Sequence, residues 1–127
     1  MTKKIVSAAF VMIGDEILSG RTEDKNLNFL AKGLAEIGIN LKQVRVVPDK
    51  EEEIIFAVNE VRKKFDYVFT SGGIGPTHDD ITSLSIAKAL NDKLIQHEKA
   101  TEILEQYYGK ENVNEARLKM AFVPSKA

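Results

Sequence analysis

The segment Asp66–Thr82 constrains the fold of this chain more than any other stretch. A short apolar run, Tyr67–Phe69, ends shortly before Ser71, and three glycines follow within four positions. Two adjacent aspartates then precede a run with helical spacing. A strand that leads through a glycine turn into a helix start is typical of phosphate sites in α/β proteins, because the backbone can approach an anion and free N–H groups stabilise its charge. The segment therefore predicts an α/β fold with an anion site at this turn.

The two aspartates, Asp79 and Asp80, cannot themselves attract phosphate. Their position beside the turn predicts a Mg²⁺ ion that bridges protein and phosphate, with both carboxylates as metal ligands. The structural alternative is that either aspartate caps the following helix, since Asp is a favoured N-cap. A glycine turn alone favours that alternative, whereas the doubled aspartate and the nearby Thr77 and Thr82 favour a ligand site.

Composition narrows the class of protein further. The chain has 127 residues, one domain's worth, with 43% hydrophobic and 29% charged residues, as in soluble globular proteins. Eighteen basic and nineteen acidic residues give a net charge of −1, so we expect no nucleic-acid or membrane partner. No cysteine is present, which excludes disulfides and thiolate chemistry. The longest apolar run, Ile5–Ile13, is too short to span a bilayer, and we expect a cytoplasmic protein.

Apolar periodicity predicts alternating strands and helices. This alternation requires right-handed crossovers and a parallel sheet between two helix layers, with ligands bound beyond the carboxyl ends of the strands. The expected strands are Ile5–Ile13, Leu41–Val47, Tyr67–Thr70 and a terminal one near Phe122; the expected helices are Leu27–Ile37, Ile54–Phe65 behind an Asp49/Glu52 capping box, Ile81–Leu90, Ala100–Tyr108, and a short one around Leu118 capped by Asn114.

Two further loops leave the same edge of the predicted sheet. Gly14-Asp15-Glu16 follows the first strand, and from spacing alone a ligand role and a solvated loop with a cap at Thr22 or Asp24 are equally open. Asp49, at the end of the second strand, is more often a plain N-cap than a catalytic residue, but its position keeps both roles open. For His78, in the glycine loop, a solvated side chain is favoured over a phosphate contact.

Several motifs, taken in order, resemble the MoaB/Mog molybdopterin-binding domain family over roughly residues 5–124. The form G-P-T-x-D-D is most similar to its CinA-like branch, the competence/damage-inducible protein A-like proteins. The motifs are Gly14-Asp15-Glu16-Ile17-Leu18, Gly20, Asn26, Val47-Pro48-Asp49, Ser71-Gly72-Gly73-Ile74-Gly75-Pro76-Thr77 and Asp79-Asp80-Ile81-Thr82.

The resemblance implies a three-layer α/β/α sandwich with a mostly parallel sheet and a symmetric homo-oligomer. The best-studied family members adenylylate molybdopterin with Mg-ATP, and CinA-type members are associated with ADP-ribose pyrophosphatase activity. The family's two important aspartates fall on Asp49 and Asp80, which become the expected catalytic residues. The expected substrate- and phosphate-binding residues are Gly14, Asp15, Glu16, Ser71, Gly72, Gly73, Gly75, Thr77 and Thr82.

Two departures from the family pattern affect these expectations. His78 stands where CinA-type chains often have Lys, which removes a fixed positive charge near the expected phosphate. Family domains also continue past the position of Ala127, so we expect one domain, residues 1–127, that lacks its C-terminal part and self-associates through an unpaired sheet edge.

Three functions remain open from the sequence. The first is an enzyme that acts on a phosphoanhydride of a nucleotide or pterin, with hydrolysis slightly favoured over adenylyl transfer. The second is a module that binds a pterin or nucleotide without chemistry, and the third is an oligomer-forming domain with a relic site.

Overall fold

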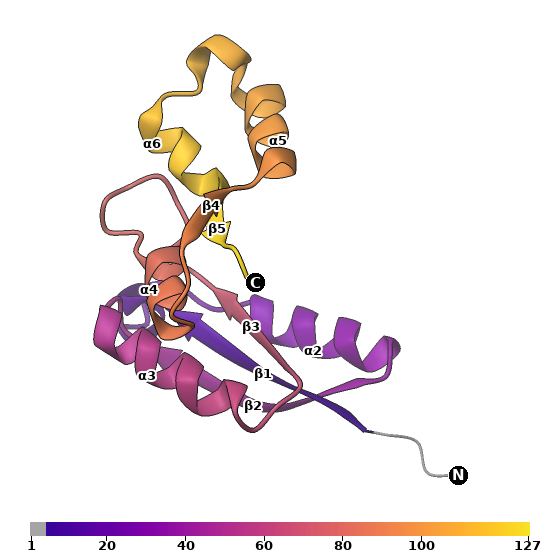
Figure 1. Ribbon diagram of the computed structural model, residues 1–127. Coiled ribbons are helices and arrows are strands. Elements are labelled where there is room, and N and C mark those ends of the chain that lie inside the picture. Colours follow the sequence, from indigo (N-terminus) through magenta and orange to yellow (C-terminus); the bar gives the residue numbers. More distant parts are fainter. Residues whose placement is uncertain (1–4) are drawn as a thin grey trace.

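A three-stranded parallel sheet forms the centre of the protein, whose computed structural model describes residues 5–127 (Figure 1). Its strands are β1 (Val6–Ile13), β2 (Ile39–Val47) and β3 (Tyr67–Ser71), in the order β2-β1-β3. The central strand is the one whose sequence is almost continuously apolar, and residues 8–13 are all buried. This confirms the prediction of a strand covered on both faces.

Helices cover the two faces of this sheet. Helix α2 (Asn26–Glu36) connects β1 to β2, and α3 (Glu51–Arg62) connects β2 to β3 on the other side of β1. Because both crossovers are right-handed but run in opposite directions along the sheet, the two helices lie on opposite faces. The α/β/α fold class is thereby confirmed.

The main hydrophobic core lies between α3 and β1. The apolar stripe of α3 recurs with helical spacing and packs on the side chains that β1 directs to this face. Side chains of Ala8, Phe10 and Met12 point to the opposite face and are also buried. The core residues from the two elements are Ala9, Val11, Ile13, Ile54, Ala57, Val58 and Val61.

A β-bulge interrupts the pairing of β1 with β2. Ala8 pairs with Leu41, whereas the next residue, Ala9, pairs with Gln43, so Lys42 is the extra residue in β2. Beyond the bulge the register is regular and ends with Ile13 opposite Val47.

The last part of the chain, residues 94–124, forms a small C-terminal unit beside α4 (Thr82–Ala89) (Figure 1). The predicted terminal strand exists, but it pairs antiparallel with β4, a strand that the sequence pattern does not predict. The elements of the unit are β4 (Leu94–Gln96), α5 (Glu98–Tyr108), η1 (Lys110–Asn112), α6 (Glu115–Leu118), η2 (Lys119–Ala121) and β5 (Phe122–Pro124).

Local capping predictions had mixed outcomes. Asn114 caps α6 as predicted, because its side chain accepts a hydrogen bond from the backbone N–H of Arg117 at 2.9 Å. The predicted capping box of Asp49 and Glu52 is wrong: the N-cap of α3 is Lys50, without a side-chain cap. Among residues 5–127, no helix has both the length and the apolar character that a membrane crossing requires.

Candidate functional site

The first two loops at the carboxyl edge of the sheet are tied to each other. The backbone N–H of Asp15, in the one-turn helix α1 (Asp15–Leu18), donates to Asp49 Oδ2 at 3.1 Å. The N–H of Asp49 donates in return to Asp15 Oδ1 at 3.2 Å. Gly14 N–H also donates to the carbonyl of Val47 at 3.0 Å. This reciprocal pairing explains why Asp49 is not available to cap α3.

The glycine turn is held in a backbone conformation that only glycine adopts readily. Gly72 and Gly73 have φ values of +90° and +66°. A Cβ on Gly72 would collide with the backbone carbonyl of Ile13, and a Cβ on Gly73 would collide with the hydroxyl of Thr82. The turn therefore packs directly against the end of β1 and the start of α4, and both contacts require glycine.

Thr82 lies on the buried side of the glycine turn, packed against Gly73, and not on its solvent side. Thr82 is 0% exposed, its N–H donates to the carbonyl of Gly73 at 3.1 Å, and its hydroxyl has no hydrogen-bond partner within residues 5–127. An unpaired buried hydroxyl costs roughly 1–3 kcal/mol, so this group is a local source of instability at the start of α4.

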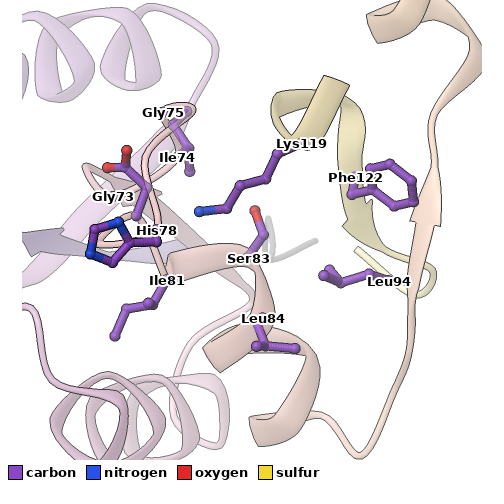
Figure 2. A pocket seen from close by; sticks show the side chains of 11 residues that line it. Gly73, Ile74, Gly75, His78, Ile81, Ser83, Leu84, Leu94, Lys119 and Phe122 are labelled. Atoms are coloured by element: carbon purple, nitrogen blue, oxygen red, sulfur yellow. The ribbon is translucent and has the colours of Figure 1, made fainter. Parts of the chain in front are cut away.

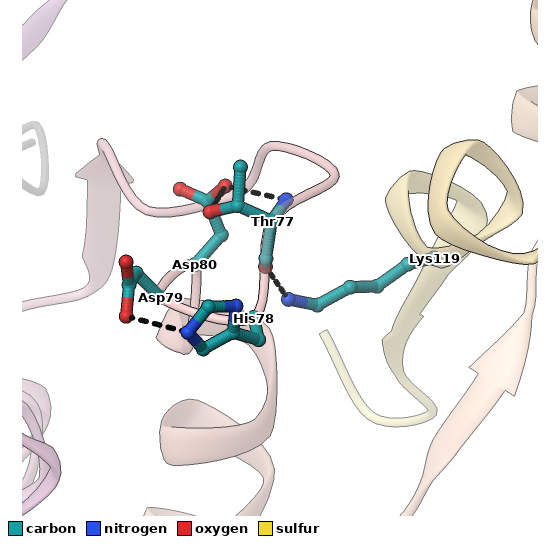
Figure 3. Close-up of polar contacts among 5 residues, drawn as sticks. All are labelled: Thr77, His78, Asp79, Asp80 and Lys119. Carbon is teal, nitrogen blue, oxygen red and sulfur yellow. Dashed lines mark hydrogen bonds and ion pairs between the residues drawn. The ribbon is translucent and has the colours of Figure 1, made fainter.

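Asp80 closes the loop that follows the turn (Figure 3). Its Oδ2 accepts hydrogen bonds from the backbone N–H of Thr77 at 3.0 Å and from the Thr77 hydroxyl at 2.8 Å. Partial burial opposes ionisation, but these bonds, a further one from Gly75 and the positive charge of Lys119 outweigh it and hold the pKa of Asp80 below its usual value. Asp80 is therefore a carboxylate at neutral pH.

Asp79 and Asp80 do not converge on one point. The carboxylate of Asp79 is 86% exposed and faces the ring of His78, 3.4 Å from its Nε2, whereas that of Asp80 turns to Thr77 (Figure 3). Neither aspartate caps α4, whose N-cap is Ile81 without a side-chain hydrogen bond. The structural alternative of an N-cap is wrong for both residues, and the solvated position of His78 agrees with the favoured interpretation.

Two cavities flank the glycine turn. The first, which we name the turn cavity, has a volume of about 220 Å³ and lies between the turn, α4 and the C-terminal unit (Figure 2). It is lined by Gly73, Ile74, Gly75, His78, Asp80, Ile81, Ser83, Leu84, Leu94, Lys119 and Phe122.

The second, the rim cavity, has a volume of about 280 Å³ and lies between the turn and the loop that joins α1 to α2. Asp24 accepts hydrogen bonds from the N–H groups of Asn26 and Leu27 at the start of α2, although the N-cap position itself is Lys25. Of the two predicted capping residues, Asp24 and not Thr22 therefore binds the start of this helix. The rim cavity is lined by Met12, Ile13, Glu16, Ile17, Thr22, Glu23, Asp24, Lys25, Asn26, Ser71 and Gly72.

The expected site residues thus divide between the two sides of the turn. Glu16, Ser71 and Gly72 line the rim cavity, and Gly73, Gly75 and Asp80 line the turn cavity. Gly14, Asp15 and Asp49 line neither and form the paired edge beside them. Three further lining residues, Lys119, Leu94 and Phe122, are not among the predicted ones, because no local sequence pattern connects the C-terminal unit with the glycine turn.

Residues 9–125 match the family described as "Probable molybdopterin binding domain", and the chain belongs to this family. Within it the resemblance to the MoaB/Mog proteins and their CinA-like branch is confirmed. A CinA-like protein of Flavobacterium psychrophilum is 38% identical over 95% of this chain and 30% of its own length. The protein CinA from Thermoplasma acidophilum, described as of unknown function, is 35% identical in sequence, and its crystal structure matches with a TM-score of 0.82 over 94% of this chain and 70% of that chain.

A probable FAD synthase of Caenorhabditis briggsae is 51% identical over 69% of this chain and 17% of its own length. The chain therefore spans less than a third of either of these two curated relatives.

Proposed function

We propose that this domain binds a phosphorylated pterin or nucleotide with Mg²⁺ and acts on its phosphoanhydride, with hydrolysis of ADP-ribose favoured over adenylyl transfer to molybdopterin. The observation that carries the proposal is the glycine turn, held by Gly72 and Gly73 between two cavities with an ionised Asp80 beside it. A ligand with organic groups on both sides of a pyrophosphate fits this arrangement. FAD, which the relative is named for making, has that chemistry.

The residues present fit a Mg²⁺ ion that is held mostly by substrate. Mg²⁺ usually takes one or two carboxylates and completes its shell with phosphate oxygens and waters. Residues 5–127 contain no group of three or more acidic or histidine side chains in a metal-binding arrangement. Asp80 is the proposed main protein ligand. Asp79 would become a second one by turning its exposed carboxylate away from His78, and the ion would supply charge neutralisation at the phosphoanhydride.

The chain's own groups then have separate roles. The backbone of Ser71, Gly72, Gly73 and Gly75 and the start of α4 bind phosphate oxygens. Asp49 is the proposed general base: its Oδ2 is engaged by Asp15, while Oδ1 has no protein partner among residues 5–127 and can accept a proton from water. Water attack on phosphorus with cleavage of the bridging P–O bond would give AMP and ribose 5-phosphate from ADP-ribose.

The test is turnover measured beside thermal stability. Asn has nearly the shape of Asp but no negative charge, so Asp80→Asn and Asp49→Asn should each lower the release of AMP from ADP-ribose by about 100-fold or more. Melting temperatures should change much less. Glu115→Gln, on exposed α6, is the control and should retain full activity. Near-native rates in both Asn variants would contradict the assignment.

A second candidate is a binding module without catalysis, which the absence of a larger acidic cluster in residues 5–127 favours. Mg²⁺-dependent stabilisation by ADP-ribose, ATP or a pterin without any turnover would identify it. We also propose a homo-oligomer, because β3 pairs only with β1 within the described residues and leaves its outer edge open. Light scattering at micromolar concentration should give a mass above that of one chain.

A further inference from the structure

One cation reaches into the turn cavity, and it comes from the C-terminal unit. Lys119, the first residue of η2, extends its side chain across the cavity toward the glycine loop (Figure 2). Its Nζ donates a hydrogen bond to the backbone carbonyl of Thr77 (Figure 3). Thr77 and Lys119 lie 42 positions apart in the sequence, so only the packing of the C-terminal unit brings them together.

Hydrogen-bond donors converge on this cavity without enough protein acceptors. An ammonium group has three donors, and Thr77 is the partner of only one of them. On the opposite wall, the backbone N–H groups of Ser83 and Leu84, in the first turn of α4, have no acceptor within residues 5–127. The hydroxyl of Ser83 points toward the same space in Figure 2.

The acidic residue that lines this cavity does not satisfy these donors. The Oδ2 of Asp80 turns to Thr77, on the loop side of the cavity (Figure 3). The carboxylate of Asp80 therefore leaves the remaining donors of Lys119 and of the start of α4 free on the cavity side. The group that suits such an array of donors is an oxyanion.

The remaining wall defines what the anion is attached to. Leu84, Leu94 and Phe122 form an apolar side opposite the glycine loop (Figure 2). A free inorganic anion has no apolar group to pack on this surface, whereas the aromatic or aliphatic group of a phosphate ester would cover it.

We propose that Lys119 is a phosphate-binding residue of the turn cavity, so that the C-terminal unit supplies the cation of a phosphate site whose other donors belong to the glycine loop and the start of α4. This inference rests on the proposed function insofar as the ligand is a phosphorylated nucleotide or pterin. Lys119 also takes over the charge that His78 does not provide, since His78 is 94% exposed and faces Asp79. The bound phosphate accepts a hydrogen bond from Lys119 Nζ, either beside the bond to the Thr77 carbonyl or in place of it. This contact fixes the C-terminal unit against the loop.

The experiment separates this role from a purely structural tether. Lys119→Met keeps most of the aliphatic stem but removes the charge, and Lys119→Arg keeps the charge. Lys110→Met is the matched control, because Lys110 is an exposed lysine of the same unit without a side-chain contact in the described residues. Binding of ADP-ribose, adenosine and inorganic pyrophosphate, each with Mg²⁺, is measured by calorimetry, together with the melting temperature.

We expect Lys119→Met to weaken the binding of ADP-ribose and pyrophosphate by about tenfold or more, since a charge-assisted hydrogen bond is lost. Adenosine binding and the melting temperature should change little, Lys119→Arg should recover most of the affinity, and Lys110→Met should match the unchanged chain. Unchanged affinity for both phosphates in Lys119→Met would overturn the inference. So would equal losses for all three ligands, or a lowered melting temperature with no selectivity for phosphate.

Failure of the proposed function gives a different result. If the unchanged chain binds pyrophosphate in a Lys119-dependent manner but binds no nucleotide, the assignment of Lys119 stands and the nucleotide ligand is wrong. If it binds ADP-ribose and Lys119→Met binds equally well, the proposed function stands and the inference is wrong. If it binds neither phosphate, both are wrong.

Discussion

The two halves of the protein stabilise their parts of the site in different ways. In the sheet half, the glycine turn is fixed by backbone contacts to β1, whose residues 8–13 are all buried. In the C-terminal unit, neither α5 nor α6 has a buried residue, and Lys119 reaches the loop through one flexible side chain. The comparison shows that one wall of the turn cavity is rigid, whereas the other rests on a small unit with little core of its own.

The largest expected difference between the halves is in the response to loss of an apolar side chain. Ile54 is 0% exposed in the main core, so Ile54→Ala should lower the free energy of unfolding by about 2–5 kcal/mol. Ile103, on α5, is 55% exposed, and Ile103→Ala should change it by less than about 0.5 kcal/mol. Urea denaturation of both variants checks this. Similar losses would show that the C-terminal unit has a core comparable to that of the sheet.

Two glycines with similar backbone conformations, one in the glycine turn and one outside it, test how tightly the turn packs. Gly72 and Gly38 both have positive φ, +90° and +83°, but a Cβ on Gly38 would meet open space. Gly38→Ala should cost about 1–2 kcal/mol for the left-handed conformation alone. Gly72→Ala adds a collision with the carbonyl of Ile13, and should cost more and also lower ligand affinity.

Melting temperature and calorimetric titration with ADP-ribose test the glycine pair. Equal destabilisation of the two variants, with ligand binding retained in both, would contradict the close contact between the turn and β1.

A smaller effect is expected from the cap of α6. Asn114→Ala removes the acceptor for the N–H of Arg117 and should cost about 1 kcal/mol. Because α6 directly precedes η2, hydrogen exchange should speed up in the C-terminal unit and stay unchanged in β1 and α3. Faster exchange throughout the chain would mean that the two halves open as a single cooperative unit.

The parts that the sequence predicted are those whose signals are local. The continuous apolar run of β1, the stripe of α3 and the Asn114 cap each depend on neighbouring residues, and the structure has all three. Gly72 and Gly73 were recognised for the same reason, since positive φ selects glycine.

The misses arise from contacts between distant segments. β4 has three residues, too few for a periodic pattern, and forms because Ile95 pairs with Val123. Asp49 resembles a cap in sequence, but its carboxylate instead accepts from Asp15, 34 positions earlier. Lys119 has no local feature that distinguishes it from the other lysines, and only the folded chain brings it to Thr77.

The bulge at Lys42 determines which residues face each other where β1 and β2 end. Because β2 has one residue more than β1 over the paired segment, its carboxyl end meets that of β1 with Val47 opposite Ile13. Deleting Lys42 would have one of two effects. Either the residues of β2 after the bulge would shift by one position along β1, or the residues of β2 before it would turn their side chains to the opposite faces of the sheet. In either case the two hydrogen bonds between Asp15 and Asp49, each from a backbone N–H to the other residue's carboxylate, would be lost. A single residue of β2 therefore sets the spacing of the loops that carry these two aspartates.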